Sequence, residues 1–267
     1  MVVFPNAKIN VGLQVLNKRD DGYHNIESIF YPVGLCDVLE IVKSSQFSFS
    51  QSGLPIQAES SDNLVIKAYN LINQEVGIGP VAIHLHKVIP MGAGLGGGSS
   101  NATFTLKLLN ELFELKLDDS KLKSLALVLG SDCPFFVKNE PSLVSGRGEI
   151  FNTTNLNLTN KWIKIIHTGL HISTKEAFSN ILSKSDLNVS KSIKYTDNSL
   201  NLKHFINAFE KNIFKNSIQL QEIKNRLKTE GAIYASMSGS GSSIYGIFDS
   251  EPVKTNSENF EYIGKLS

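Results

Sequence analysis

The stretch Pro90–Asn101, PMGAGLGGGSSN, decides how the middle of this chain folds. It contains five glycines, which remove Cβ atoms where the backbone must take positive φ: residues 92, 94, 96, 97 and 98. The apolar segment VAIHLHKVI precedes it, and apolar residues at helical spacing follow it. The pattern therefore predicts a strand, a glycine-rich loop and a helix in succession.

Such a loop is suited to binding an anion. Successive N–H groups can point into one concavity, and the following helix adds its unpaired N–H groups and the positive end of its dipole. Ser99 and Ser100 bring hydroxyls that can reach phosphate or magnesium. The loop is therefore predicted to bind nucleotide phosphates, with ATP as the expected nucleotide.

Two other phosphate-binding loops fit less well. Gly92, Gly94 and Gly97 formally satisfy GxGxxG, but that motif requires a strand with an acidic ribose ligand after the helix, whereas a second helix is indicated here. A Walker loop requires a lysine at the position of Gly98. A flexible linker or close helix packing is the remaining alternative, and the flanking strand and helix argue against it.

Composition indicates a small-molecule partner and two domains. The chain has 267 residues, 41% of them apolar, and 26 basic against 25 acidic side chains, so it has no surplus charge for nucleic acid. Cys36 and Cys133 are far apart and lack zinc-ligand spacing, which predicts reduced thiols and a cytoplasmic location. No signal-peptide pattern or membrane-spanning stretch is present, so we expect no membrane association.

The amino-terminal part is expected to be mostly sheet. The segment PNAKINVGLQV alternates apolar and polar residues, which predicts a strand with one buried face and one solvated face. Further strands are predicted over 26–33, 38–42 and 47–50. A helix is expected from Asp62, capped by Ser61 or Asp62 and ending at Gly77, and another over 118–129 ending at Gly130.

The carboxyl-terminal part alternates strands and helices. A hairpin turn at 146–148 precedes a strand that begins at Trp162, and we place a domain boundary between them, giving domains 1–155 and 156–267. A short helix is predicted over 174–182 and one broken or two consecutive helices over 202–228, separated by a polar tract with no recognisable motif. Two strands, 232–237 and 243–248, are expected to close the fold around a second glycine-rich turn at 239–241.

Three polar residues are candidates for chemistry. Lys8 and Asn10 are two apart on a predicted strand, so both can address one substrate group, although a solvated strand face is the more usual explanation of a residue such as Lys8. Asp132, in LGSDCPFF, follows a helix-terminating glycine, where an aspartate is often only a turn residue. A carboxylate and a cation that converge on an alcohol would suit phosphoryl transfer.

Five motifs, in their order and spacing, resemble the GHMP kinase superfamily: PNAKIN, DGYHNIESIF, PMGAGLGGGSSNA, LGSDCPFF and SMSGSGSS. The resemblance covers nearly the whole chain. It implies an α+β, two-domain GHMP kinase fold, with an N-terminal domain like domain 2 of ribosomal protein S5 and a C-terminal ferredoxin-like α/β sandwich. DGYH and GSDCPFF favour the kinases that act on a cytidine-diphosphate-linked methylerythritol.

The resemblance implies a reaction. The γ-phosphoryl group of ATP would pass to the 2-hydroxyl of that substrate, giving the 2-phosphate and ADP in the non-mevalonate route to isoprenoid precursors. Asp132 would be the catalytic carboxylate and Lys8 its cationic partner. Mg²⁺ would bridge the ATP phosphates, with Ser100 or Ser99 as a ligand. We expect a monomer or homodimer.

The resemblance also implies binding residues. Substrate would contact Asn10, Tyr23, His24, Tyr31 and Thr174, with Tyr31 stacking on the base, although core or hairpin packing also explains the aromatic residues. ATP would contact the whole loop: Pro90, Met91, Gly92, Ala93, Gly94, Leu95, Gly96, Gly97, Gly98, Ser99, Ser100 and Asn101. Ala93, Ser131 and Cys133 occupy variable positions of the pattern and remove no functional group.

Two other functions stay open. One is a related kinase that acts on homoserine, mevalonate or a sugar, and it predicts turnover without a cytidine group. The other is a catalytically silent nucleotide-binding module, which the joint presence of Lys8 and Asp132 disfavours.

Overall fold

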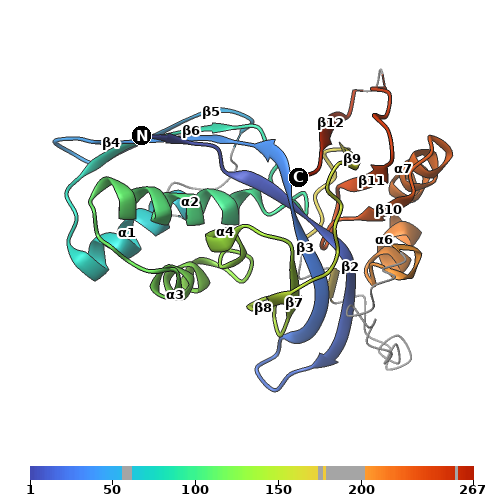
Figure 1. The fold of residues 1–267 in the computed structure, drawn as a ribbon, viewed down its shortest axis with the longest axis horizontal. Helices are drawn as coiled ribbons and strands as arrows, with labels where there is room; N and C mark the ends of the chain where they lie inside the picture. The colour runs from blue at the N-terminus through green and yellow to red at the C-terminus, as the bar shows by residue number, and fades with distance from the viewer. Residues whose placement is uncertain (56–61, 174–176, 179–201, 256–257) are drawn as a thin grey trace. The chain divides into compact units, whose positions relative to one another are not determined.

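The computed structural model describes residues 1–55, 62–173, 177–178, 202–255 and 258–267, which form two compact units (Figure 1). Unit 1 comprises Met1–Ala7, Leu35–Met91 and Gly96–Glu140, and unit 2 comprises Lys8–Gly34, Gly92–Leu95 and Pro141–Ser267. The boundary predicted between residues 155 and 156 lies within unit 2. The two predicted domains therefore do not coincide with the compact units, and that boundary stays a prediction.

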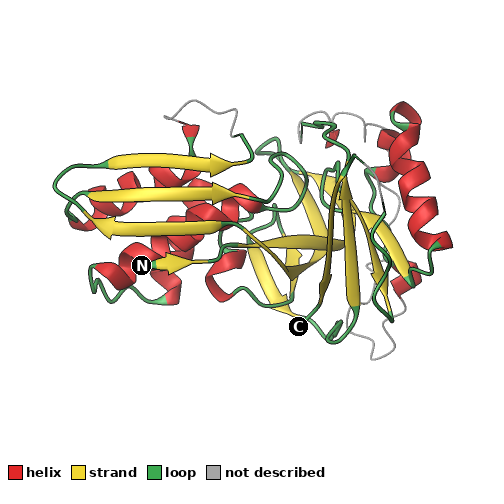
Figure 2. Ribbon diagram, turned by 90° about the horizontal axis from the view of Figure 1, so that it is seen from above, coloured by secondary structure: helices red, strands yellow, loops and turns green. Residues whose placement is uncertain are grey.

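Unit 1 contains a four-stranded sheet in the order β1-β4-β6-β5, in which only the β5–β6 pair is parallel. Its strands are β1 (Val2–Val3), β4 (Val38–Lys43), β5 (Ser48–Gly53) and β6 (Val81–Lys87). One face of this sheet is covered by α1 (Leu64–Val76), α2 (Gly97–Leu112) and α3 (Asp119–Leu129), and a short α4 (Phe135–Lys138) follows (Figure 2). Buried aliphatic side chains of strands and helices form one core between the two layers.

The helix caps of unit 1 are partly as predicted. Asp118 caps α3 by accepting a hydrogen bond from the Lys121 N–H, which confirms the predicted start. The cap of α1 is Asn63, whose side chain accepts from the Val65 N–H, so the expectation of Ser61 or Asp62 is wrong. Asparagine and aspartate cap equally well, and the sequence alone does not choose between neighbouring candidates.

Unit 2 contains two four-stranded sheets. The first has the order β2-β3-β7-β8, with β2 (Asn6–Lys18), β3 (His24–Cys36), β7 (Ser142–Ser145) and β8 (Ile150–Thr153); the last two form the hairpin predicted at 146–148. The second has the order β10-β11-β9-β12, all antiparallel, with β9 (Trp162–His167), β10 (Tyr234–Met237), β11 (Ile244–Phe248) and β12 (Phe260–Lys265).

Helices pack against the second sheet through apolar residues of α6 (Glu210–Asn216) and α7 (Ile218–Thr229), and a short η2 (Leu202–His204) precedes them. The break predicted within 202–228 falls at Ser217. Of the helix predicted over 174–182, the described Ala177 and Phe178 are helical; the rest, and the polar tract 183–201, lie outside the described residues. No helix in the described part of the chain has the length and apolar character needed to cross a membrane.

The expectation of a solvated face on β2 is wrong. Lys8 and Asn10 are only 3% and 2% exposed, although they alternate with apolar residues. Residues from the carboxyl-terminal part of the chain cover this face: Ser238 Oγ accepts from the Asn10 N–H, and Tyr245 Oη donates to the Asn10 carbonyl. An alternating pattern shows that a strand has two chemically different faces, but not that water covers the polar one.

The fold closes with three strands after α7, not the two predicted. The additional strand, β12, pairs with β9 in the register Phe260↔His167. The order of strand, helices, two strands and a last strand matches a ferredoxin-like unit, except that no helix is present among the described residues between β11 and β12.

A buried ion-pair cluster lies beside this last strand. Lys164 of β9 is fully buried, and its ammonium contacts Glu230 at 2.9 Å, Glu261 of β12 at 3.3 Å and the Val253 carbonyl at 2.8 Å. Hydrogen bonds from Thr255 fix the Glu261 carboxylate. The cluster thus attaches the segment after β11 to the sheet.

We predict that Glu261→Gln lowers stability in a pH-dependent way. Burial raises the pKa of Glu261, but hydrogen bonds from Thr255 and the Lys164 charge outweigh burial, so its pKa is lowered. A carboxyl whose pKa is lowered on folding contributes stability above its ordinary pKa and loses it as the pH falls. The melting temperature of the variant should lie below that of the wild type at pH 7, and the difference should shrink at pH 4. A constant difference would contradict the prediction.

Candidate active site

The glycine loop joins β6 to α2, as predicted, but its glycines have two different roles. Gly92, Gly94 and Gly96 have positive φ, at 61°, 77° and 69°. Gly97 and Gly98 do not, because they form the first turn of α2, with Gly96 as the N-cap. The expectation that all five glycines require positive φ is therefore wrong for the last two.

The first half of the loop, residues 92–95, is held within unit 2 by the second glycine-rich turn. Ser238 Oγ donates to the Gly94 carbonyl at 2.8 Å, and the Ser243 N–H donates to the Ala93 carbonyl at 3.1 Å. A Cβ on Gly94 would lie 2.0 Å from the Ser238 carbonyl oxygen, so only glycine fits there. The contact between the two turns thus fixes the path of the loop backbone.

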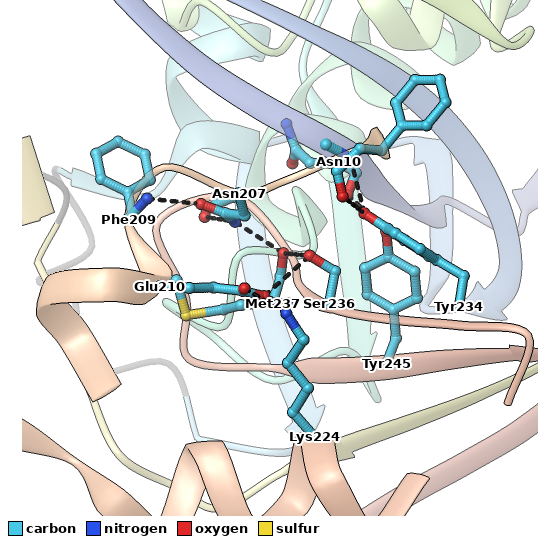
Figure 3. A network of polar contacts seen from close by, with 12 residues as sticks. Asn10, Asn207, Phe209, Glu210, Lys224, Tyr234, Ser236, Met237 and Tyr245 are labelled. Atoms are coloured by element: carbon cyan, nitrogen blue, oxygen red, sulfur yellow. Dashed lines mark hydrogen bonds and ion pairs between the residues drawn. The ribbon is translucent and has the colours of Figure 1, made fainter. Parts of the chain in front are cut away.

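The second glycine-rich turn is itself held by a buried polar network (Figure 3). The Asn207 amide donates to the carbonyls of Met237 and Gly239, both at 2.8 Å. Glu210 accepts from the Ser236 hydroxyl and the Met237 N–H, and it pairs with Lys224. The side chains of Asn207 and Glu210, before and at the start of α6, therefore hold the end of β10 and the beginning of the turn.

The second half of the loop belongs to unit 1 and presents a buried hydroxyl. Ser100 is fully buried, and its Oγ has no hydrogen-bond partner among the described residues. Asn101 is also buried, and its amide nitrogen donates a hydrogen bond to the Asp37 carboxylate at 2.8 Å. The Ser100 hydroxyl therefore has hydrogen-bonding capacity left for a ligand.

Lys8 and Asn10 form a buried pair next to the first half of the loop. The Lys8 ammonium donates to Asn10 Oδ1 at 2.6 Å and lies 4.4 Å from the centroid of the Phe30 ring. The Lys8 N–H donates to the Leu95 carbonyl at 2.9 Å, and the Asn10 amide donates to Ser28 at 3.0 Å. The sequence thus identified two residues that the fold places together and shields from bulk water.

Asp132 lies in the turn between α3 and α4, half-buried, in unit 1. Its neighbour Cys133 attaches this turn to α2, because the Thr103 hydroxyl donates to the Cys133 carbonyl at 2.8 Å. Burial raises the pKa of the Cys133 thiol to about 12, which keeps it neutral. The turn that carries Asp132 is therefore anchored to the helix that begins at the glycine loop.

The aromatic candidates differ in how far their side chains are exposed to solvent. Tyr23 is 55% exposed, and the Arg147 guanidinium lies 4.8 Å from its ring centroid. His24 is half-buried and stacks on Phe178, with ring centroids 5.2 Å apart; burial and the Lys18 charge lower its pKa.

Tyr31, in contrast, is 1% exposed, and its hydroxyl hydrogen-bonds Leu158 and Ser267. This placement contradicts stacking on a base and supports the alternative of core packing. Thr174 lies outside the described residues.

Four residues near these candidates were not identified from the sequence. Arg147 belongs to SGRGE, where the glycines drew attention to the turn alone, and nothing in the sequence distinguishes Phe178 within the helix predicted over 174–182. Asp37 and Lys87 lie 50 positions apart and form a buried ion pair. Nothing in their immediate sequence indicates this pairing.

Unit 1 also has a small hollow beside the loop, with a volume of about 60 Å³. Polar and apolar residues from the start of α1, from β6 and from the loop and α2 line it: Asp62, Asn63, Leu64, Val65, Leu85, Met91, Gly98 and Asn101. Three of these residues belong to the predicted ATP-binding set.

Known families match both parts of the chain. The family model described as GHMP kinases N terminal domain matches residues 63–140, and the one described as GHMP kinases C terminal matches residues 187–256. The mevalonate kinase of Methanococcus jannaschii has the same fold, with a TM-score of 0.68 at 11% identity over 100% of this chain and 98% of that one.

Relatives with higher sequence identity to this chain identify the family within the GHMP kinases. A 4-diphosphocytidyl-2-C-methyl-D-erythritol kinase of Cytophaga hutchinsonii is 44% identical over 94% of each chain, and one of Azobacteroides pseudotrichonymphae is 49% identical over 93% of each. A crystal structure of 4-(cytidine 5'-diphospho)-2C-methyl-D-erythritol kinase has a TM-score of 0.78 and 29% identity, covering 92% of this chain and 90% of that one. The chain therefore belongs to the GHMP kinases, in the family of the 4-diphosphocytidyl-2-C-methyl-D-erythritol kinases.

Proposed function

We propose that this chain phosphorylates the 2-hydroxyl of 4-diphosphocytidyl-2-C-methyl-D-erythritol with ATP, giving the 2-phosphate and ADP in the methylerythritol phosphate route to isoprenoid precursors. The observation that carries this is the identity of 44–49% to kinases of that name over nearly the full length of the chain. As a member of the family, the chain is a kinase with a small-molecule substrate.

The loop Pro90–Asn101 is the proposed site for the ATP phosphates. Its three positive-φ glycines and the first turn of α2 present N–H groups at a helix N-terminus, where negative charge is stabilised. The hollow lined by Met91, Gly98 and Asn101 adjoins this loop but, at about 60 Å³, is too small for a nucleoside. The ATP-binding set from Pro90 to Asn101 stays a proposal, in which Asn101 acts through Asp37.

Asp132 is the proposed proton acceptor and Lys8 its cationic partner. An alcohol is too weak an acid for a carboxylate to ionise beforehand, so Asp132 accepts the proton as the new bond to phosphorus forms. Lys8 offsets negative charge on the transferring group, and its burial strengthens this effect because less water screens it. Two hydrogen bonds support this. The Lys8 backbone N–H donates to Leu95 in the first half of the loop, and the turn that carries Asp132 is hydrogen-bonded to the helix that follows the loop.

Mg²⁺ would neutralise charge on the ATP phosphates when bound. Ser100 is the residue we assign to it, because a buried hydroxyl without a hydrogen-bond partner is satisfied by a ligand. No cluster of three or more metal-ligating side chains occurs in the described part of the chain. Mg²⁺ usually keeps several waters and takes substrate phosphates as ligands, and Ser100 would be one protein ligand beside them.

The cytidine end of the acceptor is proposed to meet Tyr23 and His24, with Asn10 holding the alcohol end. Tyr23 offers an exposed ring, and the partly buried imidazole of His24 stays neutral because its pKa is lowered. Thr174 remains a proposed contact on resemblance alone. A cytoplasmic location and a monomer or homodimer also remain predictions from the sequence.

The first test compares acceptors. ADP release that depends on Mg²⁺ should be observed with the cytidine-linked substrate and not with mevalonate or homoserine. Turnover of either alternative acceptor would instead support a related kinase. ADP release that is equal with and without acceptor would exclude the proposed transfer.

We predict that Asp132→Asn reduces kcat by at least ~10²-fold, because the amide cannot accept the proton, while MgADP binding is retained. Steady-state kinetics and calorimetric MgADP titration measure the two quantities. Asp249→Asn, which removes an exposed carboxylate paired with Lys161, is the matched control and should keep wild-type turnover. Near-normal kcat in Asp132→Asn would remove this residue from the chemistry.

We predict that Gly96→Val abolishes ATP binding and leaves the protein folded, because a β-branched residue disfavours the positive φ that shapes the loop. Gly77→Val is the matched control: Gly77 has the same φ of 69°, caps α1 outside the loop and has open space around it. Both variants should lose similar stability in thermal melting, and only Gly96→Val should lose ATP affinity. Equal ATP affinities would refute the loop assignment.

A further inference from the structure

One buried carboxylate contacts both flanks of the glycine loop. Asp37, between β3 and β4, is fully buried in unit 1. Its Oδ1 accepts from the N–H groups of Val88 and Ile89, at 2.6 and 2.8 Å, immediately before the loop begins. Its Oδ2 accepts from the Asn101 amide at 2.8 Å, where the loop ends, and from the Lys87 ammonium at 2.6 Å.

These four donors satisfy the carboxylate completely. A carboxylate offers about four lone-pair positions, and here each has one N–H group. Lys87, which is 1% exposed, supplies the compensating charge and also donates to the Ile89 carbonyl at 2.6 Å. Burial lowers the pKa of Lys87, while the charge of Asp37 and its hydrogen bond raise it. The ion is thus paired with a cation and fully hydrogen-bonded, which makes its burial tolerable.

The same arrangement explains the glycine at position 97. Its φ is not positive, so backbone conformation does not require glycine there. A Cβ at this position, however, would lie 3.0 Å from the Lys87 ammonium and 2.9 Å from Ile89. The first turn of α2 therefore lies directly against the ion pair, and any shift of the pair moves the helix start.

We propose that Asp37 is a positioning residue for nucleotide binding: with Lys87, Val88, Ile89 and Asn101 it forms a clamp, here called the Asp37 clamp, that sets the spacing between the two flanks of the phosphate loop. The proposal rests on the proposed function of that loop. The clamp acts through backbone placement and touches no substrate. Because phosphate recognition depends on where N–H groups point, a displacement of about 1 Å is enough to weaken it strongly.

The clamp is tested by Asp37→Asn. An amide offers one accepting oxygen and one donating nitrogen, so two of the four N–H groups would face another donor. Calorimetric titration should show MgADP binding weakened by about tenfold or more, and the KM for ATP should rise while the KM for the acceptor stays within twofold. Wild-type MgADP affinity in this variant would overturn the proposal.

Glu261→Gln is the matched control, because it also removes a carboxylate partner from a fully buried lysine, Lys164, but away from the loop. It should lower the melting temperature and leave MgADP affinity unchanged. If Glu261→Gln weakened MgADP binding as much as Asp37→Asn, the effect would be one of general stability and the clamp would be refuted.

A second variant covers the case in which Asp37→Asn fails to fold. Asp37→Glu keeps the charge beside Lys87 but moves it by one methylene, so it should fold and still bind MgADP several-fold more weakly. Wild-type affinity in Asp37→Glu would overturn the proposal. MgADP binding needs no acceptor, so it tests the clamp separately from the proposed function. If the wild-type protein binds MgADP but transfers no phosphoryl group to the cytidine-linked substrate, the proposed function is refuted and the clamp is not.

Discussion

If the loop Pro90–Asn101 offers its N–H groups to a phosphate, as proposed, it cannot use them to hold itself in place. This constraint governs the arrangement around Pro90–Asn101. Three of its glycines take positive φ, and the residues between β6 and α2 belong to no helix or strand. Other parts of the chain must therefore fix the loop. They can bond its carbonyl groups, hold the residues that flank it, or pack so closely against its glycines that no side chain fits. Buried polar groups of the described chain do this in both units.

In unit 2 the loop is held by close packing of its backbone against the backbone of a second turn. Gly94 lies against the Ser238 carbonyl, and the turn that carries Ser238 is fixed by Asn207 and Glu210. In unit 1 the support comes from charge, since a single carboxylate, Asp37, joins the strand before the loop to the helix after it. Hydrogen bonds in these buried places lack competition from water, so they define the backbone path closely.

The residues of the proposed chemistry differ in their exposure to solvent. Lys8 is buried and held by Asn10 and the Phe30 ring, while Asp132 and Tyr23 keep contact with solvent. A buried cation exerts its charge over a short distance with little screening, which suits a role in stabilising a transferring phosphoryl group. A half-exposed carboxylate and an exposed ring suit groups that must meet an incoming substrate.

The sequence by itself determined the features that depend on neighbouring residues. The glycine loop between a strand and a helix, the Asp118 cap and the family motifs around Lys8, Tyr23 and Asp132 were all accessible, because turn chemistry and periodicity act over a few positions. Only the tertiary structure decided which polar residues are covered. Lys8 and Asn10 are buried, and Asn10 is hydrogen-bonded by Ser238 and Tyr245, more than two hundred positions away. Tyr31 lies in the core, and Asp37 meets Lys87 and Asn101 from distant segments. Local patterns carry no information about such partners, because burial and long-range hydrogen bonds depend on how the whole chain packs.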